Sequence, residues 1–164
     1  MRCLKSLTML LAAAVPLALP AAAQETMPRF YVYGEEDAAA ELKTCQVSHN
    51  EAVALVKSQL RGAGMTVETD PSAEGDVMDT YVNINALPIE GSATSCAYSF
   101  DVSFETYGTA ANPFTGSSEF TKLAYCNRGS LMVWEKAGAQ GAIHAKLRDY
   151  VRDCLAKYRT RNDR

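Results

Sequence analysis

The stretch CAYSFDVSFET, residues Cys96–Thr106, alternates apolar and polar side chains at every step. Successive side chains of a β-strand point to opposite faces, so this stretch predicts a strand with one buried and one solvated face. Half-buried strands of this kind are typical of antiparallel sheets with one face packed on a core. The fold is therefore expected to contain an antiparallel sheet that is covered on one side.

Runs of aromatic, β-branched or alternating residues predict five further strands, separated by turn sequences. One such turn is Asn127-Arg128-Gly129, and a longer turn region with Asn112-Pro113 is expected over residues 108–116. The five strands are expected at residues 29–33, 65–69, 79–87, 119–126 and 131–135.

Two amphipathic helices complete the pattern. Ser48-His49-Asn50-Glu51 is a capping box, and apolar residues follow it at helical spacing until glycines occur at positions 62 and 64. A second helix is expected over residues 141–158, with residues 159–164 fraying, and residues 35–43 are expected to form a loop or a helical turn. The order β-α-β-β-β-β-β-α predicts an α+β fold: one mainly antiparallel sheet, two helices packed on one face, and two disulfides.

The amino-terminal residues have the features of an export signal. Arg2 and Lys5 precede a short apolar run, and Ala21-Ala22-Ala23 supplies the small residues of a cleavage site. We therefore expect a signal peptide at 1–23 and a single domain at 24–164. No cysteine lies near the cleavage site and no later apolar run reaches about 20 residues, so we expect neither a lipoprotein nor a membrane-spanning protein.

Four cysteines remain after the expected cleavage, and an oxidising compartment favours disulfides. A hairpin centred near Ala111 would place Cys96 opposite Cys126, which leaves Cys45 to pair with Cys154. These two bridges are the favoured pairing among the three that four cysteines allow. The same register would place Lys122 on the buried face opposite Phe100, and this conflict predicts a β-bulge or a register shift.

Charge is distributed unevenly along the chain. No lysine or arginine occurs between Arg61 and Lys122, whereas residues 146–164 are rich in both. We interpret this as a solvated sheet face beside a solvated helix face, with an acidic and a basic binding patch as the alternative. The net charge of −3 and the exported compartment argue against a nucleic-acid partner.

No catalytic or metal-binding motif is evident. His49 is expected at the surface, and His144 is expected to face solvent or to be partly packed, without a Gly-x-Ser-x-Gly sequence to support a nucleophile. The acidic residues Asp70, Glu74, Asp76 and Asp79 lack the spacing of a calcium loop. We therefore expect no metal, no cofactor and no enzymatic activity.

Tyrosine and amide side chains are the remaining candidates for a binding surface, and Trp134 is interpreted as a core residue. Aromatic rings with neighbouring polar groups suit protein or glycan contacts, although ordinary cross-strand pairing is the alternative explanation. We expect Tyr81, Tyr107 and Tyr125 on the sheet face away from the helices, mixed with polar residues of the strands. The candidate residues are Tyr81, Asn83, Asn85, Asp101, Tyr107 and Tyr125.

Four segments together resemble small exported proteins of Gram-negative bacteria, in a layout similar to the amino-terminal domain of TolB and related envelope modules. They are residues 60–67, the strand Tyr98–Tyr107, the strand Leu131–Trp134 and the closing helix through Arg148, Tyr150, Val151 and Tyr158. The resemblance implies a periplasmic protein whose sheet and helices make protein contacts.

These observations favour a non-enzymatic periplasmic protein that binds another protein or an envelope component. Two alternatives remain: an inhibitor of a secreted hydrolase such as a lysozyme, and a hydrolase that uses paired carboxylates, whose separation the sequence does not give.

Overall fold

The computed structural model describes residues 28–35, 40–70 and 77–162. Within these residues the chain forms β1 (Arg29–Gly34), α1 (Ala40–Thr44), α2 (His49–Gly62), β2 (Val67–Glu68) and β3 (Val77–Pro88). It continues with β4 (Ser95–Ala111), β5 (Ser118–Glu135) and α3 (Lys136–Asn162). The five strands form one sheet in the order β2-β1-β3-β4-β5, in which β1 runs parallel to both neighbours and β3, β4 and β5 are antiparallel.

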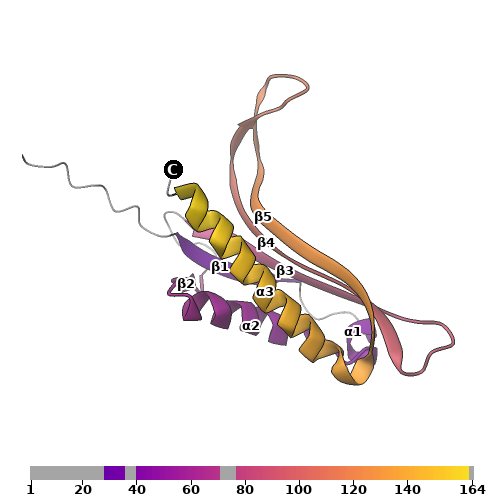
Figure 1. The fold of residues 1–164 in the computed structure, drawn as a ribbon. Helices are drawn as coiled ribbons and strands as arrows, with labels where there is room; N and C mark the ends of the chain where they lie inside the picture. Colours follow the sequence, from indigo (N-terminus) through magenta and orange to yellow (C-terminus); the bar gives the residue numbers. More distant parts are fainter. Residues whose placement is uncertain (1–27, 36–39, 71–76, 163–164) are drawn as a thin grey trace, which may run out of the picture.

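The predicted α+β class is confirmed. Helices α2 and α3 lie side by side over the same face of the sheet, and the β4–β5 hairpin continues well beyond the body of the protein (Figure 1). The expected signal peptide at 1–23 and the acidic residues Glu74 and Asp76 lie outside the described residues.

The core fills the space between the sheet and the two helices. Helix α2 begins at the predicted capping box, where the Ser48 hydroxyl accepts a hydrogen bond from the Glu51 amide. On α3 five residues that are buried, in addition to Cys154, recur at every fourth position, which keeps them on one stripe of the helix facing the sheet. These residues are Ala139, Ile143, Leu147, Val151 and Leu155.

Two element boundaries differ from the sequence interpretation. Residues 127–129 do not turn, because β5 passes through them in continuous pairing with β4 and joins the last two expected strands into one. Helix α3 begins directly after β5, at Lys136, and remains helical to Asn162, so the expected fraying from residue 159 does not occur by that point. Propensity alone suggested a turn at Asn127-Arg128-Gly129, but pairing with β4 overrides it.

The turn of the β4–β5 hairpin lies further along the chain than a centre at Ala111. Ala111 pairs with Ser118, and Asn112 closes the turn by accepting hydrogen bonds from the Phe114 amide (2.8 Å) and the Gly116 amide (2.8 Å). Gly116 adopts a positive φ of 70°, which glycine tolerates without strain. In this register Cys96 lies opposite Trp134, and Cys126 lies opposite Phe104.

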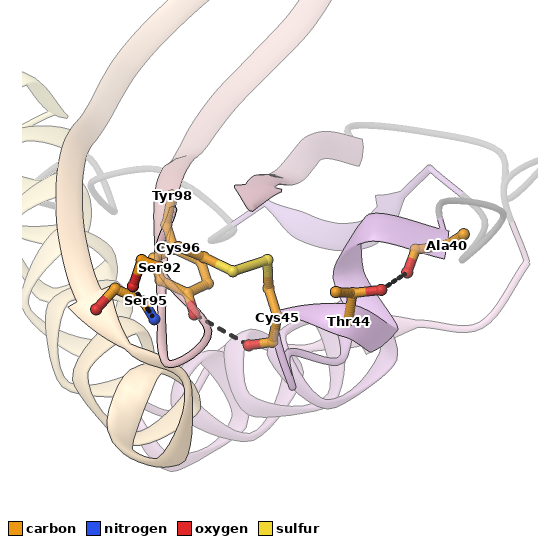
Figure 2. Close-up of a disulfide and its surroundings, with 7 residues drawn as sticks. All are labelled: Ala40, Thr44, Cys45, Ser92, Ser95, Cys96 and Tyr98. Carbon is orange, nitrogen blue, oxygen red and sulfur yellow. Dashed lines mark hydrogen bonds between the residues drawn. A yellow bond between two sulfur atoms is a disulfide. The ribbon is translucent and has the colours of Figure 1, made fainter. Parts of the chain in front are cut away.

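This register makes the predicted disulfide pairing wrong. All four cysteines form bridges, but the bridges are Cys45–Cys96 and Cys126–Cys154. Cys96 is at the end of β4 nearest α1, and Cys126 is in the middle of β5 beneath α3, so each reaches a helical segment and not the other strand. The first bridge is accompanied by a hydrogen bond from the Tyr98 hydroxyl to the Cys45 carbonyl at 3.0 Å (Figure 2).

Two aromatic residues were also misplaced. His49 is buried, not at the surface, and its Nε2 lies 2.8 Å from the Val82 carbonyl oxygen. A Cβ atom at Gly34 would lie 2.2 Å from His49 Cε1, so glycine is required there for the imidazole to fit. Trp134 is not a core residue, because 49% of it is exposed where β5 passes into α3.

We expect the Cys126→Ala/Cys154→Ala variant to lose about 2–5 kcal/mol of unfolding free energy, since the bridge restricts the unfolded chain. Urea denaturation of the oxidised protein measures this loss. Peptide mapping without reduction checks the connectivity directly. A peptide that links Cys96 to Cys126 would contradict the structure.

Thr80 is fully buried on the helix-covered face, and its hydroxyl has no hydrogen-bond partner among the described residues. Valine has nearly the same shape and no polar group to desolvate. We therefore expect Thr80→Val to raise the unfolding free energy by about 1 kcal/mol in urea denaturation. Thr80→Ser, which keeps the hydroxyl and removes a methyl group, should destabilise, and a stabilised serine variant would contradict this account.

Candidate binding surface

The sheet face opposite α2 and α3, here called the helix-free face, carries most of the residues proposed for binding. Tyr81, Asn83 and Asn85 on β3 lie beside Ser103, Asp101 and Ser99 on β4, because both strands place their odd-numbered residues on this face. The Asn85 amide donates to the Asn83 side-chain oxygen (3.1 Å), and the Asn83 amide donates to Asp101 (3.0 Å). The structure thus brings together Tyr81, Asn83, Asn85 and Asp101.

Tyr107 lies on the same face, whereas Tyr125 does not. Tyr107 is the register partner of Lys122, two positions after Glu105 on β4, and its ring stacks on Phe120 with centroids 6.1 Å apart. Tyr125 contacts Tyr158 of α3 with centroids 6.4 Å apart, so it lies on the helix side of the sheet and not on the expected face. The cause is the predicted bulge, which is confirmed between Phe104 and Glu105.

The bulge decides which face the residues of β5 occupy. Cys126 pairs with Phe104, but the next pair is Ala124 with Glu105, so Tyr125 is the extra residue. Without it, Lys122 would fall on the helix side of the hairpin. With it, Lys122 lies on the helix-free face and its ammonium is 2.9 Å from a Glu105 carboxylate oxygen.

Glu105 is the most buried charged residue of the helix-free face, with only 1% of its surface exposed. Its carboxylate accepts hydrogen bonds from the Tyr33 hydroxyl (2.9 Å) and the Ser103 hydroxyl (3.0 Å), in addition to the Lys122 ion pair. A buried charge is costly unless it is paired and hydrogen-bonded, and these three donors meet that requirement. The hydrogen bond to Glu105 raises the pKa of Lys122, an effect that burial partly opposes.

Three tyrosines form a row beside this cluster. The rings of Tyr31 and Tyr33 stack with centroids 5.8 Å apart, and the Tyr33 and Tyr81 centroids are 5.3 Å apart. Burial and then the Glu105 hydrogen bond raise the pKa of Tyr33. Burial and a hydrogen bond to Glu35 raise the pKa of Tyr81 to about 12.

Asp79 lies between the tyrosine row and Glu105, as the register partner of Tyr31 on one side and Glu105 on the other. Burial, followed by repulsion from the Glu105 charge, raises the pKa of Asp79. Two carboxylates in different environments therefore sit on neighbouring strands. Because Glu105 is already engaged by three donors, it is poorly suited to act as a free nucleophile or base.

Sequence reasoning did not select Tyr31, Tyr33, Asp79, Glu105 or Lys122. The alternation in the first strand placed both tyrosines on one face, and Glu105 occupied a polar position of the strand at residues 96–106. These patterns show which face a residue occupies. They do not show that separate strands bring the residues together.

Several polar groups outside the helix-free face already have partners. His144 is partly packed, and its ring contacts the Gln140 amide; burial lowers the pKa of His144. On α3, Arg152 is paired with Asp149 and Asp153, and Arg159 donates to the Ala63 carbonyl. In the described parts of the chain, no group of three or more His, Cys, Asp or Glu residues could hold a metal ion.

Comparisons with known proteins add little to this description. The sequence matches no protein-family model, and no curated protein matches it. A crystal structure of the rare lipoprotein B from Shewanella oneidensis is similar at 12% identity, covering 83% of this chain and 99% of that chain, with a TM-score of 0.39. A likeness at that TM-score supports no argument about fold or function, and the expected likeness to TolB stays a prediction.

The two disulfides are characteristic of an oxidising compartment and so indicate an exported protein. Among the residues placed by the structure, no helix has both the length and the apolar character of a membrane span.

The raised pKa of Asp79 predicts a pH effect on stability. The folded state holds this proton more tightly than the unfolded chain, so the ionised carboxylate destabilises the fold at neutral pH. We expect Asp79→Asn to raise the Tm at pH 7, with the gain disappearing as the pH falls below the ordinary value of 3.8. Thermal unfolding from pH 2.5 to 7 tests this, and an equal gain at both ends would contradict it.

Proposed function

We propose that this protein is a non-enzymatic periplasmic binding protein that contacts a partner protein of the cell envelope through its helix-free face. The observation that supports the proposal is that this face combines a row of tyrosine rings with hydrogen-bonded polar side chains and is left uncovered by α2 and α3. Aromatic residues with polar neighbours are the usual composition of protein interfaces. Their fixed positions lower the ordering cost of binding.

Disulfide clamping supports the same role. Cys45–Cys96 holds the segment before α2 to β4, and Cys126–Cys154 holds α3 to β5. The side of the sheet that carries the helices is thus fixed, and the opposite side is presented as a rigid platform. A rigid platform suits recognition of a partner whose surface is already formed.

Two serines offer matched positions for a test in cells. Ser99 is exposed on the helix-free face, and Ser58 is exposed on α2 at the opposite side of the molecule. We expect a photo-cross-linking residue at position 99 to give discrete adducts with one envelope protein, and the same residue at position 58 to give none of them. Mass spectrometry identifies the adduct.

Further outcomes test the proposal and separate it from the inhibitor alternative. The adduct should disappear when Tyr81→Leu is added to the position-99 variant, because the ring would then be missing from the contact. Absence of adducts at position 99, or the same adducts at both positions, would contradict a binding role for this face. An adduct with a secreted hydrolase would favour the inhibitor alternative.

A further inference from the structure

The helix-free face has an excess of negative charge, and the distribution of cations along the chain explains it. Because residues 62–121 contain no lysine or arginine, β3 and β4 contribute no cation to the face. Arg29 and Lys122, on β1 and β5, supply positive charge at its two sides. Each is already matched, Arg29 with Glu68 at 3.0 Å and Lys122 with Glu105 at 2.9 Å.

The carboxylates of Asp101, Glu35 and Asp79, on or beside the face, are not in ion-pair contact with a cation among the described residues, although the charge of Asp101 contributes to the raised pKa of Lys122. Asp101 accepts a hydrogen bond from the Asn83 amide, and Glu35 accepts one from the Tyr81 hydroxyl, but both donors are neutral. Asp79 faces Glu105, which has the same charge. Among the described residues none of the three carboxylates forms an ion pair. The raised pKa values of Tyr33, Asp79 and Tyr81 agree with burial in a negative field.

The tyrosine rings lie next to these carboxylates. Tyr81 is flanked by Tyr33, which is its register partner on β1, and Tyr31 is the register partner of Asp79. A guanidinium group stacks on an aromatic face and also donates two parallel hydrogen bonds to a carboxylate. Tyrosine rings beside carboxylates that form no ion pair are therefore expected to bind an arginine side chain better than a neutral or anionic group.

We propose that the helix-free face binds an arginine-bearing segment of a partner protein, with the side chains of Asp79 and Asp101 pairing with guanidinium groups and the rings of Tyr31, Tyr33 and Tyr81 stacking on them. This inference depends on the proposed binding role of the face and names the chemistry of the partner. An anionic segment is disfavoured, because each cation that reaches the face is already paired. Arginine is favoured over lysine, since its planar fork matches both kinds of group.

The probe is an octapeptide of alternating arginine and serine, and its control replaces each arginine with citrulline, which has the same shape without the charge. Isothermal titration calorimetry of the oxidised protein is expected to show at least about tenfold tighter binding of the arginine peptide, because its guanidinium groups donate charge-assisted hydrogen bonds that citrulline does not form. Equal affinity for the two peptides would overturn the inference.

A matched pair of variants separates a site from a general charge effect. Asp79→Asn/Asp101→Asn should weaken binding of the arginine peptide at least about tenfold. Asp149→Asn/Asp153→Asn makes the same chemical change on the exposed surface of α3, where both aspartates face Arg152, and should change affinity less than about twofold. If both variants weaken binding equally, the peptide responds to net charge and the inference fails. Circular dichroism confirms that both variants are folded.

The tyrosine ring is tested separately. Tyr81→Phe keeps the ring and should retain most of the binding of the arginine peptide, whereas Tyr81→Leu should lose it. Equal affinities of the two variants for the peptide would refute the stacking of arginine on this ring.

A second copy of this chain, with its basic α3, is another possible occupant of the face. If the protein forms a dimer on size-exclusion chromatography and Asp79→Asn/Asp101→Asn abolishes it, the proposal of a separate partner protein is overturned. Envelope adducts at position 99 without binding of the arginine peptide would leave the proposed function standing and refute the cationic partner.

Discussion

One extra residue in β5 determines which face each side chain of the outer hairpin occupies. On one side of the bulge the Cys126 side chain faces the helices, and on the other side the Lys122 side chain faces the opposite face of the sheet. Tyr125, the inserted residue, packs against Tyr158 of α3. A single irregularity in the ladder thus serves a disulfide on one face and an ion pair on the other, which a regular strand of the same sequence would not do.

The ion pair between Lys122 and Glu105 matters because it neutralises a carboxylate that is buried. Glu105 is closed off from water on a face that is otherwise solvated, with donors from β1, β4 and β5 converging on it. Three strands are therefore linked through one side chain. Lys122, the cation that β5 places on this face, pairs with Glu105, and Asp79 and Asp101 form no ion pair among the described residues.

The sequence predicted those features of the fold that depend on local pattern. Alternation in residues 96–106 gave the strand and its buried face, the capping box at Ser48 gave the start of α2, and the misplaced Lys122 gave the bulge. Features that depend on long-range register were not predicted correctly. The hairpin turn lies beyond Ala111, so Cys96 and Cys126 are not opposite each other and the predicted disulfide pairing was wrong. Residues 127–129 pair with β4 and do not form the turn that their sequence favours. For the binding surface, five of the six selected residues share one face, but the tyrosine row and Glu105 needed the β1–β3–β4 order, which no local pattern encodes.

Both disulfides join a helical segment to the β4–β5 hairpin, through Cys45 before α2 and Cys154 within α3, so both helices are tethered to the sheet by a covalent bond. These bonds restrain separation of the helices from the sheet. The projecting end of the hairpin is different, because it carries exposed aromatic residues such as Phe114 and Phe120 and lies outside both bridges. Segments with few packed neighbours open most easily. We therefore expect changes of shape on complex formation to be largest at the projecting end of the hairpin.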